Sequence, residues 1–191
     1  MPLIMNPKRV VTAAAVAFAL VLAVAPAAGA TAPGSGVARA HRADFDDVRA
    51  ATAAYWNLKV AKSVRGYTTK VIDLAGRSCI ADPNGSGAMG VHFVNASLLT
   101  DGAIDALRPE ALIYARGSDG VRHLVAVEYL VFRDAWDAAH AQPPRLFGRS
   151  FELIPAGNRY GLPDFYELHA WVWKFNPSGA FADWNPRVHC P

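Results

Sequence analysis

Four ionisable side chains lie inside runs of apolar residues, where charged groups are rare. They are two histidines and two glutamates: His92, Glu110, Glu128 and His169. Glu128 is the most unusual of them, because four hydrophobic residues flank it on each side. A carboxylate buried in such a run must find a partner or take up a proton. These four residues are therefore the candidates for chemistry.

Imidazole and carboxylate groups together are typical ligands of Zn²⁺, Fe²⁺, Mn²⁺ and Cu²⁺. If the faces of the strands converge, His92, Glu128 and His169 form a metal site of two histidines and one carboxylate. Glu110 would be a fourth ligand or the partner of a ligand. An open coordination position would admit water or a small-molecule substrate. No local motif such as HExxH sets the spacing, so the hypothesis depends on strands that are distant in the sequence.

Structural roles for the same residues stay open. Glu128 could instead form a salt bridge with an arginine such as Arg122, Arg149 or Arg159. Either histidine could be a neutral, hydrogen-bonded core residue, or could lie at a strand edge and face water. Perturbed ionisable groups also occur in purely structural networks.

Other catalytic motifs are weak or missing. The chain has no GxSxG segment of a serine hydrolase. Glu110 and Glu128 can be drawn as a glycosidase pair, but nothing in the sequence sets the distance between their carboxyl groups. Glycines in 85–90 match the dinucleotide-binding spacing, yet they precede the strand-like run 91–94 instead of opening a helix. Whether the protein is an enzyme therefore stays open.

A second hypothesis is a binding module near the C-terminus. Trp171, Trp173 and Trp184 could form an aromatic surface for carbohydrate or another amphipathic ligand. Trp171 and Trp173 alternate as a buried strand face also requires, so packing in the core is an equally good explanation. A purely structural or interaction role is a third hypothesis.

The pattern of the chain predicts an α+β fold with one long N-terminal helix on an antiparallel sheet or half-barrel of four to five strands. Asp44 can cap the helix and Gly66 can end it. The strongest strand signal is a hairpin over 111–132, with the turn Gly-Ser-Asp-Gly at 117–120. Further strands are expected near 68–74, 91–94 and 165–174.

The first thirty residues have the features of a cleavable signal peptide (1–30). Lys8 and Arg9 precede an uncharged apolar run, and Ala-Gly-Ala at 28–30 suits cleavage before Thr31. A flexible tail (31–42) and a single domain (43–191) would follow. The protein is then expected to be secreted, or periplasmic where the host has an outer membrane, with no membrane contact after cleavage.

The charge balance argues against nucleic acid as a partner. Of the 19 basic residues two lie in the signal peptide, which leaves 17 basic against 16 acidic side chains. No expected element carries a basic stripe. The chain has two cysteines, Cys79 and Cys190, and an oxidising compartment predicts a disulfide between them. Free thiols or metal ligands are the alternative, but no CxxC spacing supports a metal site.

Several segments are similar to known sequences. GAMGVHFVN (87–95), LHAWVWKFNPSGAF (168–181) and WNP (184–186) resemble a group of small secreted bacterial proteins of unassigned function. The resemblance runs from the first expected helix to the C-terminus. It implies a secreted protein of one domain and implies no activity.

Overall fold

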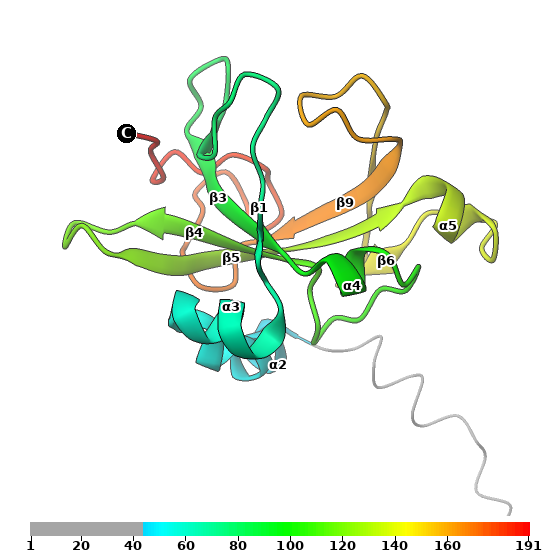
Figure 1. The fold of residues 1–191 in the computed structure, drawn as a ribbon, viewed down its shortest axis with the longest axis horizontal. Coiled ribbons are helices and arrows are strands. Elements are labelled where there is room, and N and C mark those ends of the chain that lie inside the picture. Colours follow the sequence, from blue (N-terminus) through cyan, green and yellow to red (C-terminus); the bar gives the residue numbers. More distant parts are fainter. Residues whose placement is uncertain (1–43) are drawn as a thin grey trace, which may run out of the picture. The chain divides into compact units, whose positions relative to one another are not determined.

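The computed structural model describes residues 44–191, so the expected signal peptide and tail lie outside the described residues. The centre of this part is a seven-stranded antiparallel sheet (Figure 1). Its strands are β1 (Thr69–Lys70), β2 (Ile80–Ala81), β3 (Ala88–Val94), β4 (Ala111–Arg116), β5 (Arg122–Phe132), β8 (Glu152–Ile154) and β9 (Phe165–Ala170). The order is β1-β3-β4-β5-β9-β8, with β2 also paired to β3. A separate hairpin joins β6 (Arg145–Leu146) to β7 (Arg149–Ser150).

The expected hairpin over 111–132 is confirmed as β4 and β5. The two strands pair from Ala111 opposite Glu128 to Arg116 opposite Arg122, and Gly117 N–H donates to the carbonyl of Val121 across the turn. Five further strands join this hairpin in the sheet. The sheet therefore has more strands than the four to five that were expected.

The expectation of one long N-terminal helix is wrong. The region forms two eight-residue helices with a turn of 3-10 helix between them, and the described fold is mostly antiparallel sheet with short helices. The elements are α2 (Phe45–Thr52), η1 (Ala53–Trp56) and α3 (Leu58–Arg65), followed later by α4 (Ala96–Leu99) and α5 (Arg133–Asp137). Among these described helices none has the length and apolar character to cross a membrane.

The helix breaks at Asn57, which has extended backbone angles. Its side chain accepts a hydrogen bond from Lys59 N–H and so starts a new helix, a role that asparagine fills well. The ends of the region are as expected. Asp44 caps α2 through the N–H groups of Asp46 and Asp47, and Gly66 ends α3 in the left-handed region.

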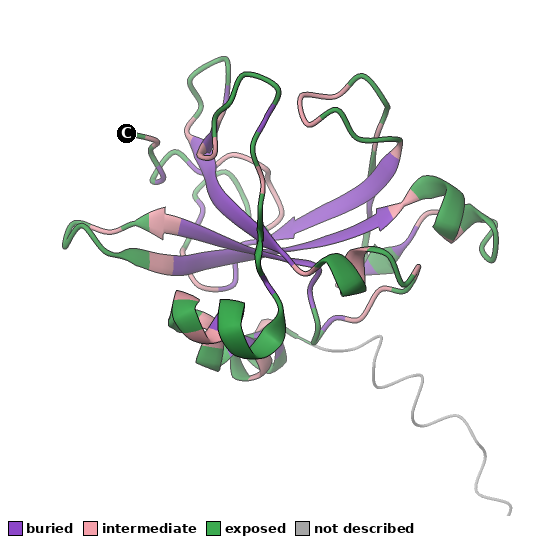
Figure 2. Ribbon diagram, viewed as in Figure 1, coloured by how far each residue is buried: buried purple, intermediate pink, exposed green. Residues whose placement is uncertain are grey.

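The two faces of the sheet have different surroundings. The face towards α2 and α3 carries the larger hydrophobic core, which includes Tyr114, Tyr129 and Leu168. Residues paired directly across strands share a face, so Glu128 and His169 lie together on the other face. Figure 2 shows that the central strands are buried along most of their length. Both faces are therefore covered.

Loops and the C-terminal segment cover the second face. In Figure 1 the loops that follow β1 and precede β9 lie on the side of the sheet opposite α2 and α3. They meet where Leu74 N–H donates to the carbonyl of Arg159. The C-terminal segment pairs with the start of β3 through a bridge between Ala88 and Asn185.

The structure explains why one position of the glycine-rich segment before β3, Gly87, is a glycine. Its φ is +115°, and a Cβ atom there would lie 2.2 Å from the carbonyl oxygen of Asn185. Only glycine permits this approach of two backbones. Gly87 thus serves the contact between β3 and the C-terminal segment, whereas a Cβ atom at Gly90 would meet the carbonyl oxygen of Tyr114 on β4.

The predicted disulfide between Cys79 and Cys190 is present, and it closes a loop with a sequence separation of 111 residues. Cross-links that close long loops restrict the unfolded chain most. The bond therefore holds the C-terminal cover against the β2 region.

We predict that the variant Cys79→Ser/Cys190→Ser loses about 4 kcal/mol of unfolding free energy, as the chain-entropy model gives for a loop of this length. Urea denaturation followed by tryptophan fluorescence measures the loss. Wild-type protein in reductant should match the variant, and the variant should not respond to reductant. A loss below about 1 kcal/mol would contradict a stabilising role for the bond.

Candidate metal centre

Three strands bring His92, Glu128 and His169 together. His169 on β9 lies directly opposite Glu128 on β5. His92 comes from β3, which is separated from β5 by β4. On β4, Glu128 lies opposite Ala111, whose side chain is small, and His92 lies opposite Ile113, two residues further along the same strand. The convergence that the metal hypothesis required is present in the structure.

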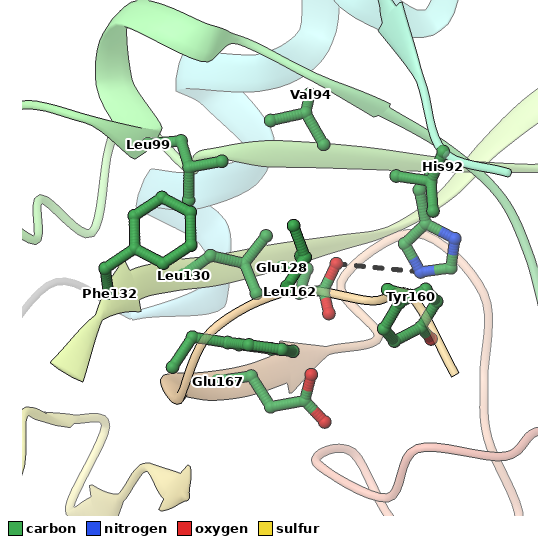
Figure 3. A pocket seen from close by; sticks show the side chains of 11 residues that line it. His92, Val94, Leu99, Glu128, Leu130, Phe132, Tyr160, Leu162 and Glu167 are labelled. Atoms are coloured by element: carbon green, nitrogen blue, oxygen red, sulfur yellow. Dashed lines mark ion pairs between the residues drawn. The ribbon is translucent and has the colours of Figure 1, made fainter. Parts of the chain in front are cut away.

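The distances within the cluster resemble those between ligands of one ion. Oε2 of Glu128 lies 3.6 Å from Nε2 of His92, and Oε1 lies 3.4 Å from Nε2 of His169 (Figure 3 shows the first pair). Hydrogen bonds of this type are usually 2.7–2.9 Å long. Ligand atoms about 2.1 Å from a tetrahedral ion are about 3.4 Å apart. The three residues thus form a group that could hold a metal ion.

The imidazole nitrogens of the cluster are buried and lack hydrogen bonds. Within residues 44–191, none of the four ring nitrogens of His92 and His169 has a hydrogen bond of ordinary geometry, although Oδ1 of Asp183 lies 3.3 Å from Nδ1 of His169. The two side chains are 4% and 0% exposed. Leaving a buried polar group unpaired costs about 1–3 kcal/mol. The arrangement therefore favours a bound ion over histidines satisfied in the core, and burial argues against histidines that face water.

The pKa values leave His92 ready to bind a metal ion, whereas His169 and Glu128 would release protons on binding. Burial, and then the positive charge of His169, lower the pKa of His92 to about 3, so its imidazole is neutral. Burial disfavours the charged form of His169, but the nearby carboxylates of Glu128, Asp183 and Glu167 outweigh it and raise its pKa to about 9. Burial raises the pKa of Glu128. An ion that displaces the proton of His169 would find two imidazoles and a carboxylate.

Two further carboxylates adjoin the cluster and were not among the predicted site residues. Oδ1 of Asp183 lies 3.3 Å from Nδ1 of His169 and can orient the ring, as carboxylates do for many metal-bound histidines. Glu167, two residues before His169 on the same strand face, is buried. Burial, and then the charges of Glu128 and Asp183, raise its pKa to about 8, against the effect of His169. Glu167, His169 and Asp183 are a second group that could hold an ion.

The sequence offered one indication for Glu167: it lies two residues from His169, and alternate residues of a strand share a face. Asp183 gave none, because it lies in the irregular C-terminal segment.

Glu110 is buried but does not join the cluster. It immediately precedes Ala111, the residue opposite Glu128, so its side chain leaves the sheet on the opposite face. There its carboxyl group accepts a hydrogen bond from Leu130 N–H. Burial raises its pKa to about 9. Glu110 is therefore not placed to act as a fourth ligand, or as the partner of Glu128 in a glycosidase pair.

The arginines proposed as partners of Glu128 lie elsewhere. Arg159 donates to Asp73 over 2.8 Å and to the carbonyl of Ala81. Within the described residues the ion pairs of Glu128 are with histidines alone, and none involves Arg122 or Arg149. A salt bridge to arginine does not account for this buried carboxylate.

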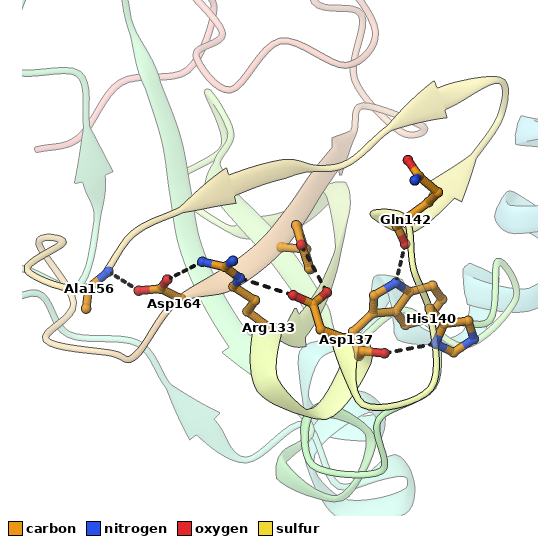
Figure 4. Close-up of polar contacts among 8 residues, drawn as sticks. Arg133, Asp137, His140, Gln142, Ala156 and Asp164 are labelled. Carbon is orange, nitrogen blue, oxygen red and sulfur yellow. Dashed lines mark hydrogen bonds and ion pairs between the residues drawn. The ribbon is translucent and has the colours of Figure 1, made fainter.

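The loop 155–164 over the site is held at both ends. Arg133 at the start of α5 pairs with Asp164 at 3.1 Å, and Asp164 accepts from Ala156 N–H at 2.8 Å (Figure 4). Further along the loop, Arg159 pairs with Asp73. Its hydrogen bond holds the pKa of the Asp73 carboxyl below its usual range. The loop is thus fixed where it carries Tyr160 and Leu162 towards the site.

The tryptophans of the aromatic hypothesis are used in packing. Trp171 is buried, and its indole N–H donates to the carbonyl of Ala182. Trp173 donates to Oγ1 of Thr52 on α2 at 3.0 Å. Trp184 is partly buried. Aromatic residues do cluster here, but the N–H groups of the first two are already satisfied within the fold.

Comparison of the chain with protein-family models, curated proteins and solved structures gave no match. The site must therefore be interpreted from its own geometry.

We predict that Glu110 makes the protein less stable as pH rises from 5 to 9. The folded protein keeps a proton on this carboxyl up to about pH 9, whereas the unfolded chain releases it near pH 4.5. The free energy of unfolding should fall by up to about 1.4 kcal/mol per pH unit from this group. Glu110→Gln should remove that part of the slope.

Urea denaturation in chelator at several pH values measures the effect. The exposed Glu152 on β8 provides the control, because Glu152→Gln should keep the wild-type pH dependence. Equal slopes for the Glu110→Gln variant and the wild type would show that this carboxyl is ionised in the folded protein.

Proposed function

We propose that the protein binds one divalent transition-metal ion through Nε2 of His92, Nε2 of His169 and the carboxylate of Glu128. The observation that carries the proposal is the orphaned state of the buried imidazoles. Within residues 44–191 neither Nε2 atom has a hydrogen bond, and both face Glu128 at ligand-to-ligand distances. Two imidazoles and a carboxylate suit zinc, copper, iron or manganese.

Charge supports an ion at this position. Three acidic residues, Glu128, Glu167 and Asp183, surround His169, and no arginine or lysine pairs with them among the described residues. Without an ion, the protons on His169 and Glu167 limit the net charge of the cluster, and a divalent ion would take the place of such protons. His92 and Glu128 also line a cavity, so an ion between them would have a coordination position open towards it.

We further propose that the protein is exported. The Cys79–Cys190 disulfide supports this, because such bonds persist in oxidising compartments. Expression of the full chain in a bacterium, followed by N-terminal sequencing of protein from the medium or periplasm, tests the proposal. Mature protein should begin at Thr31. Protein found only in the cytoplasm with Met1 or Pro2 at its start would contradict it.

The metal is tested on full-length protein exported to an oxidising periplasm and purified without chelator or histidine tag. Mass spectrometry should find close to one transition-metal ion per chain. Glu128→Gln, which keeps the shape of the side chain, and His92→Ala/His169→Ala should lose the ion while circular dichroism shows a retained fold. Because only the folded chain holds the three ligands together, metal at 100 times its dissociation constant should add about 2.7 kcal/mol to wild-type stability.

His123 is the matched control. It is a partly buried histidine paired with Asp119 at the β4–β5 turn, and His123→Ala should keep the ion. Asp183→Asn should keep the site but weaken metal affinity by about 10- to 100-fold. Wild-type protein that carries no metal, and takes up none from buffers with zinc, copper, iron or manganese, would overturn the proposal.

A further inference from the structure

A cavity of about 50 Å³ extends from the metal cluster along the same face of the sheet. Its polar side chains lie at one side, where Figure 3 shows His92, Glu128 and Glu167. To the left in the same view lie Leu130, next to Glu128, and then Phe132. The cavity thus has one polar end and an apolar body.

The apolar part offers no hydrogen-bond partner to an occupant. Besides the polar end, Tyr160 is the one polar residue that lines it, and its hydroxyl points to Sδ of Met89 at 3.8 Å. The remaining wall residues are aliphatic or phenylalanine, with Val94 and Leu162 among them. A polar group placed in this part would lose its hydrogen bonds to water, at a cost of about 1–3 kcal/mol.

The volume limits the size of an occupant. An apolar cavity that binds benzene in another protein measures about 150 Å³, and a water molecule takes about 30 Å³ in the liquid. A space of about 50 Å³ therefore suits a molecule of two to four non-hydrogen atoms.

We propose that this cavity binds a small molecule with a short apolar body and a single oxygen or nitrogen donor, which completes the coordination of the metal ion. Short primary alcohols and the corresponding carbonyl compounds have this chemistry. The inference rests on the proposed metal-binding function, because the donor atom needs the ion as its partner.

The full-length protein loaded with Co²⁺ provides the test, since the visible spectrum of cobalt reports a change of ligand. The probes are methanol, ethanol, 1-propanol and 1-butanol. Each added CH₂ should tighten binding about fourfold up to 1-propanol, as expected for burial of that group. The gain should stop at 1-butanol, which exceeds the cavity.

A second probe tests the single polar end. 1,2-Ethanediol has as many non-hydrogen atoms as 1-propanol but carries a hydroxyl at each end. It should bind at least tenfold more weakly, because its second hydroxyl would have no partner. Equal or tighter binding of the diol would overturn the inference.

Leu162→Trp tests the location. Leu162 lines the cavity and is 37% exposed, so a larger side chain can enter the cavity from the surface. The variant should keep cobalt and lose the dependence on chain length. Leu153, 38% exposed on β8 and outside the cavity, supplies the control. Leu153→Trp should behave as the wild type does.

The outcomes separate the two proposals. A protein that takes up no cobalt refutes the metal site, and the ligand inference falls with it. Cobalt binding without a rise in affinity along the alcohols refutes the ligand inference alone. If Leu162→Trp does not fold, the alcohol series and the diol measured on wild-type protein still test the ligand inference.

Discussion

The burial of Glu128 is the constraint on which the rest of the structure depends. The residue lies near the middle of β5, the longest strand, with covered faces on both sides of the sheet. A carboxylate there needs partners from neighbouring strands, because the four residues on each side of it along its own strand are hydrophobic. Those partners are His92 on β3 and His169 on β9. The register of four adjacent strands is therefore also the geometry of the site.

Glu110 and Glu128 lie on opposite faces of the sheet, and each buried carboxyl group is stabilised in a different way. Glu110 faces the helix-covered core, where burial keeps it protonated and a backbone N–H is its partner. Glu128 faces imidazoles and further carboxylates on the other side. The first arrangement needs no charge, whereas the second places a protonated His169 beside Glu128, and both side chains are buried. Among the described residues, the second also brings together groups that could hold a metal ion.

The sequence predicted features that depend on local chemistry. The turn at 117–120 and the alternating residues beside it identified the hairpin. Ionisable residues in apolar runs identified three members of the cluster. The pairing of the two cysteines followed from their number and from the expected export to an oxidising compartment. Each of these conclusions needs only neighbouring residues or a count.

Features that depend on strand register and strand order could not be predicted from the sequence. Alternation shows which residues of one strand share a face, but it does not relate that face to another strand, so Glu110 was grouped with Glu128. The position of β9 beside β5 brings Glu167 to the site, and the covering segment brings Asp183. The helical sequence pattern continues through Asn57, and for that reason one long helix was expected. The side chain of Asn57 caps α3 instead, and the helix is interrupted there.

The separation of the three cluster residues along the chain has a consequence for the proposed metal binding. His92 and His169 meet only after β3, β4, β5 and β9 have all paired, and these are contacts between distant parts of the chain. An unfolded chain on its way across a membrane has no such site. With the proposed export, loading would follow folding, and the metal supply outside the cytoplasm would determine which ion the protein carries.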